Sequence, residues 1–250
     1  MIYAEVGLNH NGDADYANEY VNFHKANDFS GLSFQIREPK FYLREEKKHL
    51  KLPKSFYDSL FHKYEDSKGK LIGLALASLD TFDELKDIKF DFYKILSIAA
   101  KDEILIESLL KKTDSQIFIS CGLLNKKDLD FVIKKYIKNV RVKFIYTQLS
   151  YDAKNLNLIN LFNLFNKYNS KIAYGHHYTN ELPIIISQVM NDLDLFIYLK
   201  GNKKIIHPDE EHAFNFDQFN KLLKQLNEEK EILGNKDIFF ASNDISIQNK

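Results

Sequence analysis

Residues 2–13 read IYAEVGLNHNGD, an apolar run that ends abruptly in a cluster of polar side chains. A turn explains the last three of these residues, because Asn, Gly and Asp are common turn formers. It does not explain Glu5 inside the apolar run, or Asn9 and His10 at its end. The stretch therefore predicts a buried strand whose carboxyl end presents polar groups.

Seven further short apolar runs follow the first along the chain. Several are apolar at nearly every residue, which is typical of strands buried on both faces. The eight predicted strands cover residues 2–8, 31–36, 71–77, 91–97, 116–120, 141–147, 171–175 and 195–199. Segments with helical spacing cover residues 14–26, 55–67, 81–87, 102–112, 125–138, 155–168, 180–191 and 213–233. Strands and helices thus alternate along the whole chain.

Eight strand–helix units predict an α/β fold of the (β/α)8 or TIM barrel type, with a doubly wound open sheet as the alternative. We assign residues 1–230 to the barrel and residues 231–250 to a C-terminal tail. Residues 38–48 form a long insertion after the second strand, and we interpret it as a lid or binding loop.

The overall composition argues against several classes of function. The 250 residues include 35 basic and 35 acidic side chains, so no strong basic field favours nucleic acid. Cys121 is the only cysteine, which leaves no internal disulfide. We see no signal peptide and no apolar run near the roughly 20 residues that span a bilayer. We therefore expect a cytoplasmic protein with small-molecule ligands, and no nucleic-acid or membrane partner.

Polar residues stand at most of the predicted strand ends, where (β/α)8 barrels gather their catalytic groups. They are Gln35, Lys94, Ser97, Ser120, Thr147, His176, His177 and Lys200, followed by His207, Asp209 and His212 in the last loop. Adjacent strand residues point to opposite faces, so at most one of His176 and His177 faces inward unless the strand has already ended. Structural alternatives stay open, because Glu5 could be a core carboxylate paired with Lys94.

Several of these motifs, taken in order, resemble those of the sialic acid synthase family. The similar stretches are AEVGLNHNGD (4–13), LSFQ (32–35), DFYKILS (91–97), ISCGL (119–123), YTQLSY (146–151), AYGHHYTN (173–180) and PDEEHAFNFDQF (208–219). Family members condense phosphoenolpyruvate with an N-acylated hexose, assisted by a divalent metal. The resemblance spans roughly residues 2–226 and implies a nonulosonate synthase in surface-carbohydrate biosynthesis, a transferase.

The resemblance also implies a role for individual residues. Those expected to be catalytic are Glu5, His10 and Lys94. Those expected to bind substrate are Asn9, Gln35, Ser97, Ser120 and Lys200, and His177 is the expected ligand of a Mn or Mg ion. The expected ligands are a sugar and a phosphoenolpyruvate-like acid, and a homodimer is the expected assembly.

The sequence departs from the family pattern at several of its site positions. Ser33 stands in place of a Lys, Ala99 in place of a Glu, and the stretch FIYLKGN (196–202) lacks a second metal-binding His. The family's C-terminal antifreeze-like domain is also missing from these 250 residues. We therefore expect a degenerate site with altered or weak activity and weak or absent metal binding. One alternative is a non-catalytic barrel that binds a sugar or a partner protein, and another is an aldolase that uses Lys94 as a Schiff base.

Overall fold

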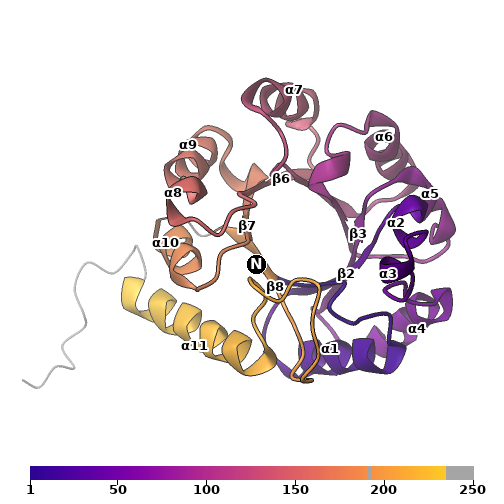
Figure 1. Ribbon diagram of the computed structural model, residues 1–250. Helices are drawn as coiled ribbons and strands as arrows, with labels where there is room; N and C mark the ends of the chain where they lie inside the picture. Colours follow the sequence, from indigo (N-terminus) through magenta and orange to yellow (C-terminus); the bar gives the residue numbers. More distant parts are fainter. Residues whose placement is uncertain (191–192, 235–250) are drawn as a thin grey trace, which may run out of the picture.

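The chain folds into a closed barrel of eight parallel strands, seen end-on in Figure 1. A computed structural model describes residues 1–190 and 193–234. The strands are β1 (Ile2–Gly7), β2 (Gly31–Ile36), β3 (Leu71–Leu76), β4 (Phe92–Ile95), β5 (Gln116–Ser120), β6 (Val142–Thr147), β7 (Ile172–His176) and β8 (Asp194–Tyr198). The predicted (β/α)8 barrel is confirmed, and the open sheet is wrong because β1 pairs with β8.

Helices surround the barrel on its outside (Figure 1). They are α1 (Ala14–Ala26), α2 (Pro39–Tyr42), α3 (Glu45–Lys48), α4 (Lys54–Tyr64), α5 (Leu79–Glu84), α6 (Glu103–Lys112), α7 (Lys126–Tyr136), α8 (Ala153–Leu156), α9 (Leu158–Tyr168), α10 (Leu182–Met190) and α11 (Phe216–Leu233). Among the described residues, none of the helices has the length and apolar character needed to cross a membrane.

Local chemistry shifts several boundaries from their predicted positions. β4 stops at Ile95, because the chain turns there into a short 3-10 helix that begins at Ser97. α11 begins at Phe216, because Asn215 accepts a hydrogen bond from the Gln218 N–H at 2.9 Å and caps the helix. The insertion after β2 is not a plain loop, since it holds α2 and α3. α11 ends at Leu233, and the rest of the predicted tail, from residue 235, lies outside the described residues.

The core has two layers, one on each side of the sheet. Outward-facing strand side chains pack against the helices. The inner layer consists of Tyr3, Phe92, Phe118, Ile145, Ala173 and Phe196. Gly73 leaves room for this layer, because a Cβ there would lie 2.2 Å from the Phe92 ring. The aromatic side chains fill the amino-terminal half of the barrel, so the space inside the barrel lies at its carboxyl end.

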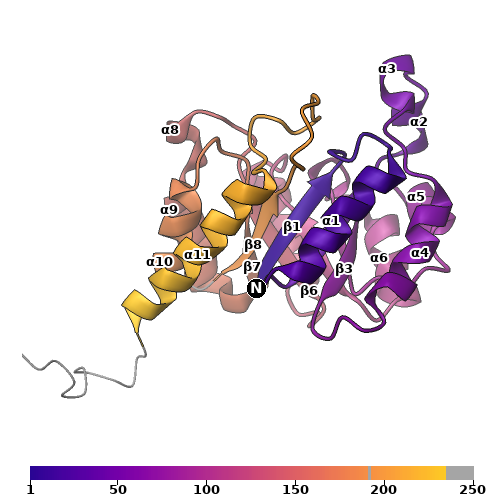
Figure 2. The ribbon, with the colours of Figure 1, turned by 90° about the horizontal axis from the view of Figure 1, so that it is seen from below.

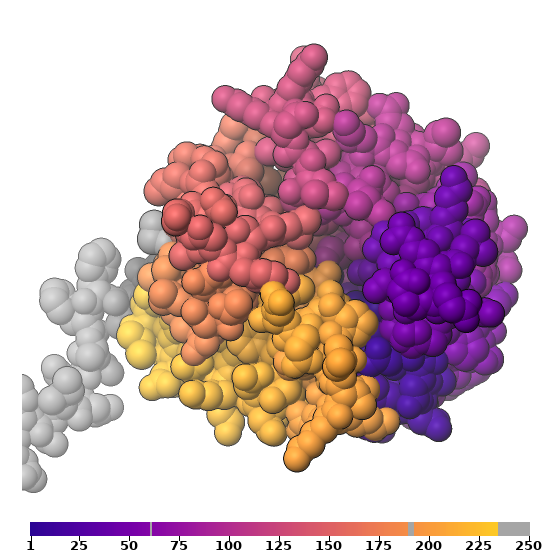
Figure 3. Space-filling view, viewed as in Figure 1, coloured from indigo at the N-terminus to yellow at the C-terminus, as the bar shows by residue number. Residues whose placement is uncertain are grey.

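The carboxyl ends of the strands therefore form the open face of the molecule. Figure 2 shows the strands from the side, with α2, α3 and the loop before α11 projecting from that end. Figure 3 looks onto the same face and shows a hollow near its middle, beside the segment that carries α2 and α3. We call this hollow and the inward-facing side chains at the strand ends the mouth.

Candidate functional site

A buried ion pair stands at the base of the mouth, just above the aromatic layer. Lys94 of β4 and Glu5 of β1 face inward and pair through Nζ and Oε1. Both side chains are only 3% exposed, and a charge buried this deeply requires a partner. The second Glu5 oxygen and the neighbouring Ser33 hydroxyl have no hydrogen-bond partner among the described residues. Such buried, unsatisfied atoms are expected to meet a ligand or a water.

Two serines face each other where β4 and β5 end. The Ser97 and Ser120 hydroxyl oxygens are 2.8 Å apart, and the Gly122 N–H donates to Ser97 Oγ at 3.2 Å. Gly122 has no space for a side chain, because a Cβ would lie 2.7 Å from Thr147 Cγ2. Hydroxyls and a backbone N–H in one place can bind carboxylate or phosphate oxygens.

Two stacked imidazoles form the opposite side of the mouth. His177 follows β7 directly, and its Nδ1 lies 2.8 Å from the Thr147 hydroxyl. Its ring stacks on His212 with the centroids 4.8 Å apart, and the Tyr198 ring packs edge-on against both. Tyr151 OH lies 3.2 Å from His212 Nδ1. Sequence reasoning missed Tyr198, because it reads as one more apolar strand residue.

Asp209, in the loop before α11, brings a titratable carboxyl to this group. Burial and the nearby Glu5 charge raise the pKa of Asp209 to about 7, while the Leu8 N–H and Lys94 act in the opposite direction. Its Oδ1 lies 4.0 Å from His212 Nε2. A carboxyl group that titrates near neutral pH in a cleft can take up or release a proton during a reaction.

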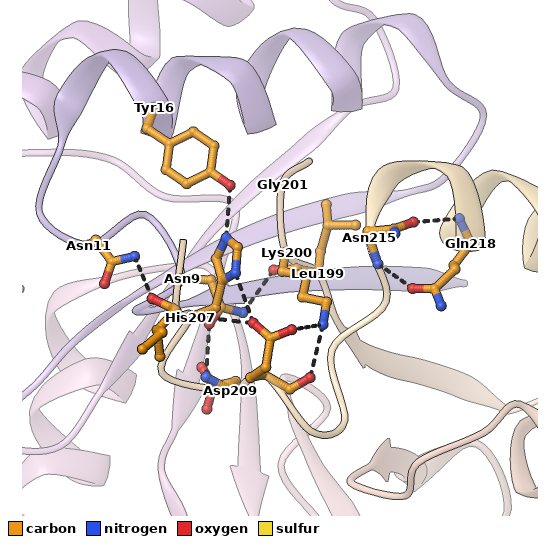
Figure 4. Close-up of polar contacts among 12 residues, drawn as sticks. Asn9, Asn11, Tyr16, Leu199, Lys200, Gly201, His207, Asp209, Asn215 and Gln218 are labelled. Atoms are coloured by element: carbon orange, nitrogen blue, oxygen red, sulfur yellow. Dashed lines mark hydrogen bonds and ion pairs between the residues drawn. The ribbon is translucent and has the colours of Figure 1, made fainter. Parts of the chain in front are cut away.

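Asn9 holds the Asp209 loop against the barrel (Figure 4). Its side-chain amide donates to the Leu199 carbonyl at 3.0 Å and accepts from the Asp209 N–H at 2.9 Å. Tyr20 OH donates to the Asn9 carbonyl at 3.1 Å. The structure therefore places Asn9, a predicted substrate ligand, in a fully buried position that orients Asp209.

Two other predicted site residues, His10 and Lys200, lie apart from the ion pair, and a third, Gln35, stays on the inward face of the sheet. His10 is fully buried beside Phe34 on the outer side of the sheet, and its Nδ1 accepts from the Gly12 N–H at 2.9 Å. Lys200 pairs with the Glu210 carboxylate and donates to the Glu210 carbonyl at 3.0 Å. Gln35 alternates with Ser33 on the inward face of β2 and is half-buried.

The adjacent histidines divide as strand geometry requires. His177 faces the mouth, whereas His176 faces the helices, with its Nδ1 3.3 Å from Tyr174 OH and its ring 5.8 Å from Phe214. The prediction that at most one of them faces inward is confirmed. His207, which the sequence also offers, contacts Tyr16 OH at 2.8 Å and Glu210 and so braces the loop (Figure 4).

The donors in the mouth do not match a divalent metal site as they stand. No three His, Cys, Asp or Glu side chains among the described residues are grouped as metal ligands would be. One ring nitrogen of His177 already contacts the Thr147 hydroxyl. The His177 and His212 rings stack face to face, so their nitrogens do not point at a common metal position. Metal binding by His177 therefore stays a prediction.

The buried histidines make the fold sensitive to acid. Burial lowers the pKa of His10 to about 3, and burial together with the His212 charge lowers that of His176 to about 3. In the unfolded chain these histidines have an ordinary pKa near 6.5, so they take up protons at a higher pH than in the folded chain. Folding stability is therefore lost as the pH falls below about 6.5. At pH 4.5 we expect each to cost about 2 kcal/mol relative to pH 7.

Urea unfolding at a series of pH values measures this loss. His176→Phe should flatten the acid limb, whereas the exposed His49→Gln should leave it unchanged. An equal slope in His176→Phe and wild type would contradict the assignment of a neutral buried imidazole.

Fold and site together define a class of protein: a (β/α)8 barrel that carries its polar groups at the carboxyl end, as barrel enzymes do. The chain belongs to the NeuB family, whose sequence profile matches residues 26–238. The family resemblance seen in the sequence is thereby confirmed. A comparison with curated proteins gives no match.

Solved structures share the fold at low sequence identity. The N-acetylneuraminic acid (sialic acid) synthetase of Leptospira borgpetersenii, in complex with citrate, is 19% identical with a TM-score of 0.84, over 97% of this chain and 87% of that one. The spore coat polysaccharide biosynthesis protein spsE of Bacillus subtilis is 15% identical with a TM-score of 0.77, over 93% and 68%. The DAHP synthase of Thermotoga maritima is 12% identical with a TM-score of 0.72, over 93% and 71%. At these identities the likeness establishes the fold.

Proposed function

We propose that this chain is a synthase-type protein of surface-carbohydrate biosynthesis. Its mouth binds a phosphoenolpyruvate-like acid and an acylamino sugar, and it turns them over weakly. NeuB family membership supports the pathway, as do the names of the similar Leptospira and Bacillus structures. The observation that carries the ligand class is the set of polar groups at the inward strand ends, where Lys94 pairs with a Glu5 carboxylate that keeps one unsatisfied oxygen and where the Ser97 and Ser120 hydroxyls meet.

In this proposal each side of the mouth holds one ligand. The Ser97 and Ser120 hydroxyls and the Gly122 N–H hold carboxylate or phosphate oxygens of the acid. Tyr198 and the stacked histidines face the sugar, because aromatic faces suit the apolar faces of sugar rings. Asp209 lies near enough to exchange a proton with the sugar side.

Weak turnover follows from the pairing of the cations around the mouth. Lys94 forms an ion pair with Glu5, Arg37 forms one with Glu38 at 2.9 Å, and Lys200 forms one with Glu210. A carboxylate beside each cation cancels much of the charge that would stabilise a departing phosphate. The pairing of Lys94 with Glu5 gives the aldolase alternative no separate support.

Ligand binding is tested by the thermal shift of the protein with phosphoenolpyruvate and N-acetylmannosamine at millimolar concentration. A ligand present at 100 times its dissociation constant adds about 2.7 kcal/mol of stability, so the melting temperature should rise by several degrees. Ser97→Ala should remove most of the rise caused by phosphoenolpyruvate, because it loses one hydroxyl and disturbs Ser120. The exposed Ser55→Ala on α4 is the matched control. No rise with either ligand would contradict the proposal.

Metal binding should be weak, because the second histidine of the family pattern is missing and His177 is already engaged by Thr147. Titration calorimetry with Mn²⁺ should give a dissociation constant well above about 1 μM, which corresponds to about 8 kcal/mol. Tight binding that disappears in His177→Gln would show that the side chains rearrange into a complete site.

A further inference from the structure

An apolar cavity lies behind the carboxyl ends of β5 and β6, between the sheet and the helices α7 and α9, which flank β6 (Figure 1). Its volume is about 80 Å³, and most of its wall is apolar: Leu124, Leu129, Ile133, Phe144, Leu164 and Ile172. Protein interiors are close-packed, and an unfilled apolar space lowers stability. A group from another molecule that entered this cavity would gain contacts with the wall.

A wider groove adjoins the cavity on the outside of the molecule. Its volume is about 480 Å³, which is within the range of about 300–1,000 Å³ that is usual for small-molecule sites. The two spaces share five lining residues, Leu124, Leu129, Tyr146, Gln148 and Leu164. The cavity is therefore the inner end of the groove, and we call the two together the α7–α9 groove.

The outer rim of the α7–α9 groove is polar. Lys126 and Asp130 reach it from α7, and Asn160, Asn163 and Lys167 reach it from α9. The Asp130 carboxylate interacts electrostatically with Lys167 and offsets one of the two lysine charges. The rim keeps a net positive charge, so charge complementarity favours a ligand with an anionic group.

The size of the inner cavity limits which apolar groups can enter it. A cavity of roughly 150 Å³ lined by Leu, Ile and Phe binds benzene in another protein. The cavity behind β5 and β6, at about 80 Å³, is about half as large. It therefore suits the end of an aliphatic chain better than an aromatic ring.

We propose that the α7–α9 groove binds a medium-chain carboxylate, with its alkyl end in the cavity and its carboxylate beside Lys126 and Lys167. The apolar wall removes the chain from water, and the rim supplies the cations for the head. The site lies on the helix side of the sheet and is separate from the mouth, although Gly122 and Thr147 of its wall also contact side chains of the mouth. The inference does not depend on the proposed function.

Titration calorimetry of the full chain with heptanoate, octanoate and benzoate tests the ligand class. Octanoate should bind about 4-fold more tightly than heptanoate, because it buries one more CH₂ group. Benzoate has as many carbon atoms as heptanoate, and it should bind more weakly because its ring does not enter the cavity. Equal affinity for benzoate and heptanoate would overturn the proposal. The absence of octanoate binding at millimolar concentration, as when a second copy of the chain covers the groove, would also overturn it.

Substitutions test whether octanoate lies in the groove or in the mouth. Leu164→Phe fills the groove and should weaken octanoate binding at least about 10-fold. Leu110→Phe on α6 is the matched control, because Leu110 is also a partly buried leucine at the edge of the core, and it should bind as the wild type does. Ser120→Ala in the mouth should also keep its affinity. Loss of binding in Ser120→Ala but not in Leu164→Phe would place the carboxylate at the serine pair and overturn the proposal.

A second variant tests the head of the ligand without touching the core. Lys126→Gln with Lys167→Gln changes two exposed side chains, so the fold is kept even if Leu164→Phe is unstable. It should weaken octanoate binding about 3-fold at low salt, and the difference from the wild type should shrink as salt is added. Unchanged affinity at low salt would overturn the assignment of an anionic head at this rim.

Discussion

Replacing Lys94 by alanine should lower the free energy of unfolding by about 3–5 kcal/mol. The change leaves the Glu5 carboxylate charged among aromatic side chains, and Glu5 is only 3% exposed. Lys101→Ala is the matched control, because Lys101 is 58% exposed and pairs with Asp128 at 2.8 Å on the surface. That control should change stability by less than about 1 kcal/mol. Urea unfolding at pH 7 measures both.

Removing both charges distinguishes the cost of an unpaired buried carboxylate from the cost of lost side-chain packing. Glu5→Gln with Lys94→Met keeps the side-chain volumes similar and leaves no isolated charge, so we expect most of the lost stability to return. If the double variant were as unstable as Lys94→Ala, the loss would come from packing and not from the orphaned carboxylate. A loss in Lys94→Ala no larger than in the surface control would contradict the burial of the pair.

The sequence is sufficient to predict the barrel, because its strands are buried on both faces. Continuous apolar runs such as residues 117–119 arise when one face meets the helices and the other meets the barrel interior. The boundaries that shifted depend on local contacts across several residues. The helix start at Asn215 depends on its contact with Gln218, and the strand end at Ile95 depends on the 3-10 helix that begins at Ser97.

The site is predictable where strand alternation alone decides it. Glu5, Lys94 and Ser120 lie on inward positions, so the strand pattern brings them together, and Glu5 pairs with Lys94 as the sequence allows. The placement of the His177 side chain toward the mouth, opposite to that of His176, follows from the same alternation.

Loop geometry decides the other residues, and the sequence does not fix it. Asn9 resembles a ligand at a strand end, yet its amide is used by Leu199 and Asp209. His10 turns behind β2 because the loop bends at Asn11 and Gly12, which both have positive φ. Lys200 meets Glu210 only because the loop before α11 folds back on β8. These placements depend on contacts between residues far apart in the chain.

Turnover of phosphoenolpyruvate with N-acetylmannosamine should be at least about 10⁴-fold below that of an intact family synthase. Loss of one preorganised charge-stabilising contact typically costs about 100- to 1000-fold in rate. Here Ser33 stands in place of an expected Lys, and the stretch 196–202 lacks an expected His. Such losses do not simply add, so the product of the two factors is only a guide.

The proposal that the mouth is degenerate is tested most directly by phosphate release at high protein concentration, with phosphoenolpyruvate, N-acetylmannosamine and Mn²⁺ present. The Leptospira synthetase serves as the reference, and Glu5→Gln with Lys94→Met serves as the inactive control. We predict release at least about 10⁴-fold slower than the reference, alongside the ligand-induced thermal shift of the wild-type protein. Turnover close to that of the reference, abolished in the double variant, would contradict the degenerate site and show that this mouth is a fully competent synthase centre.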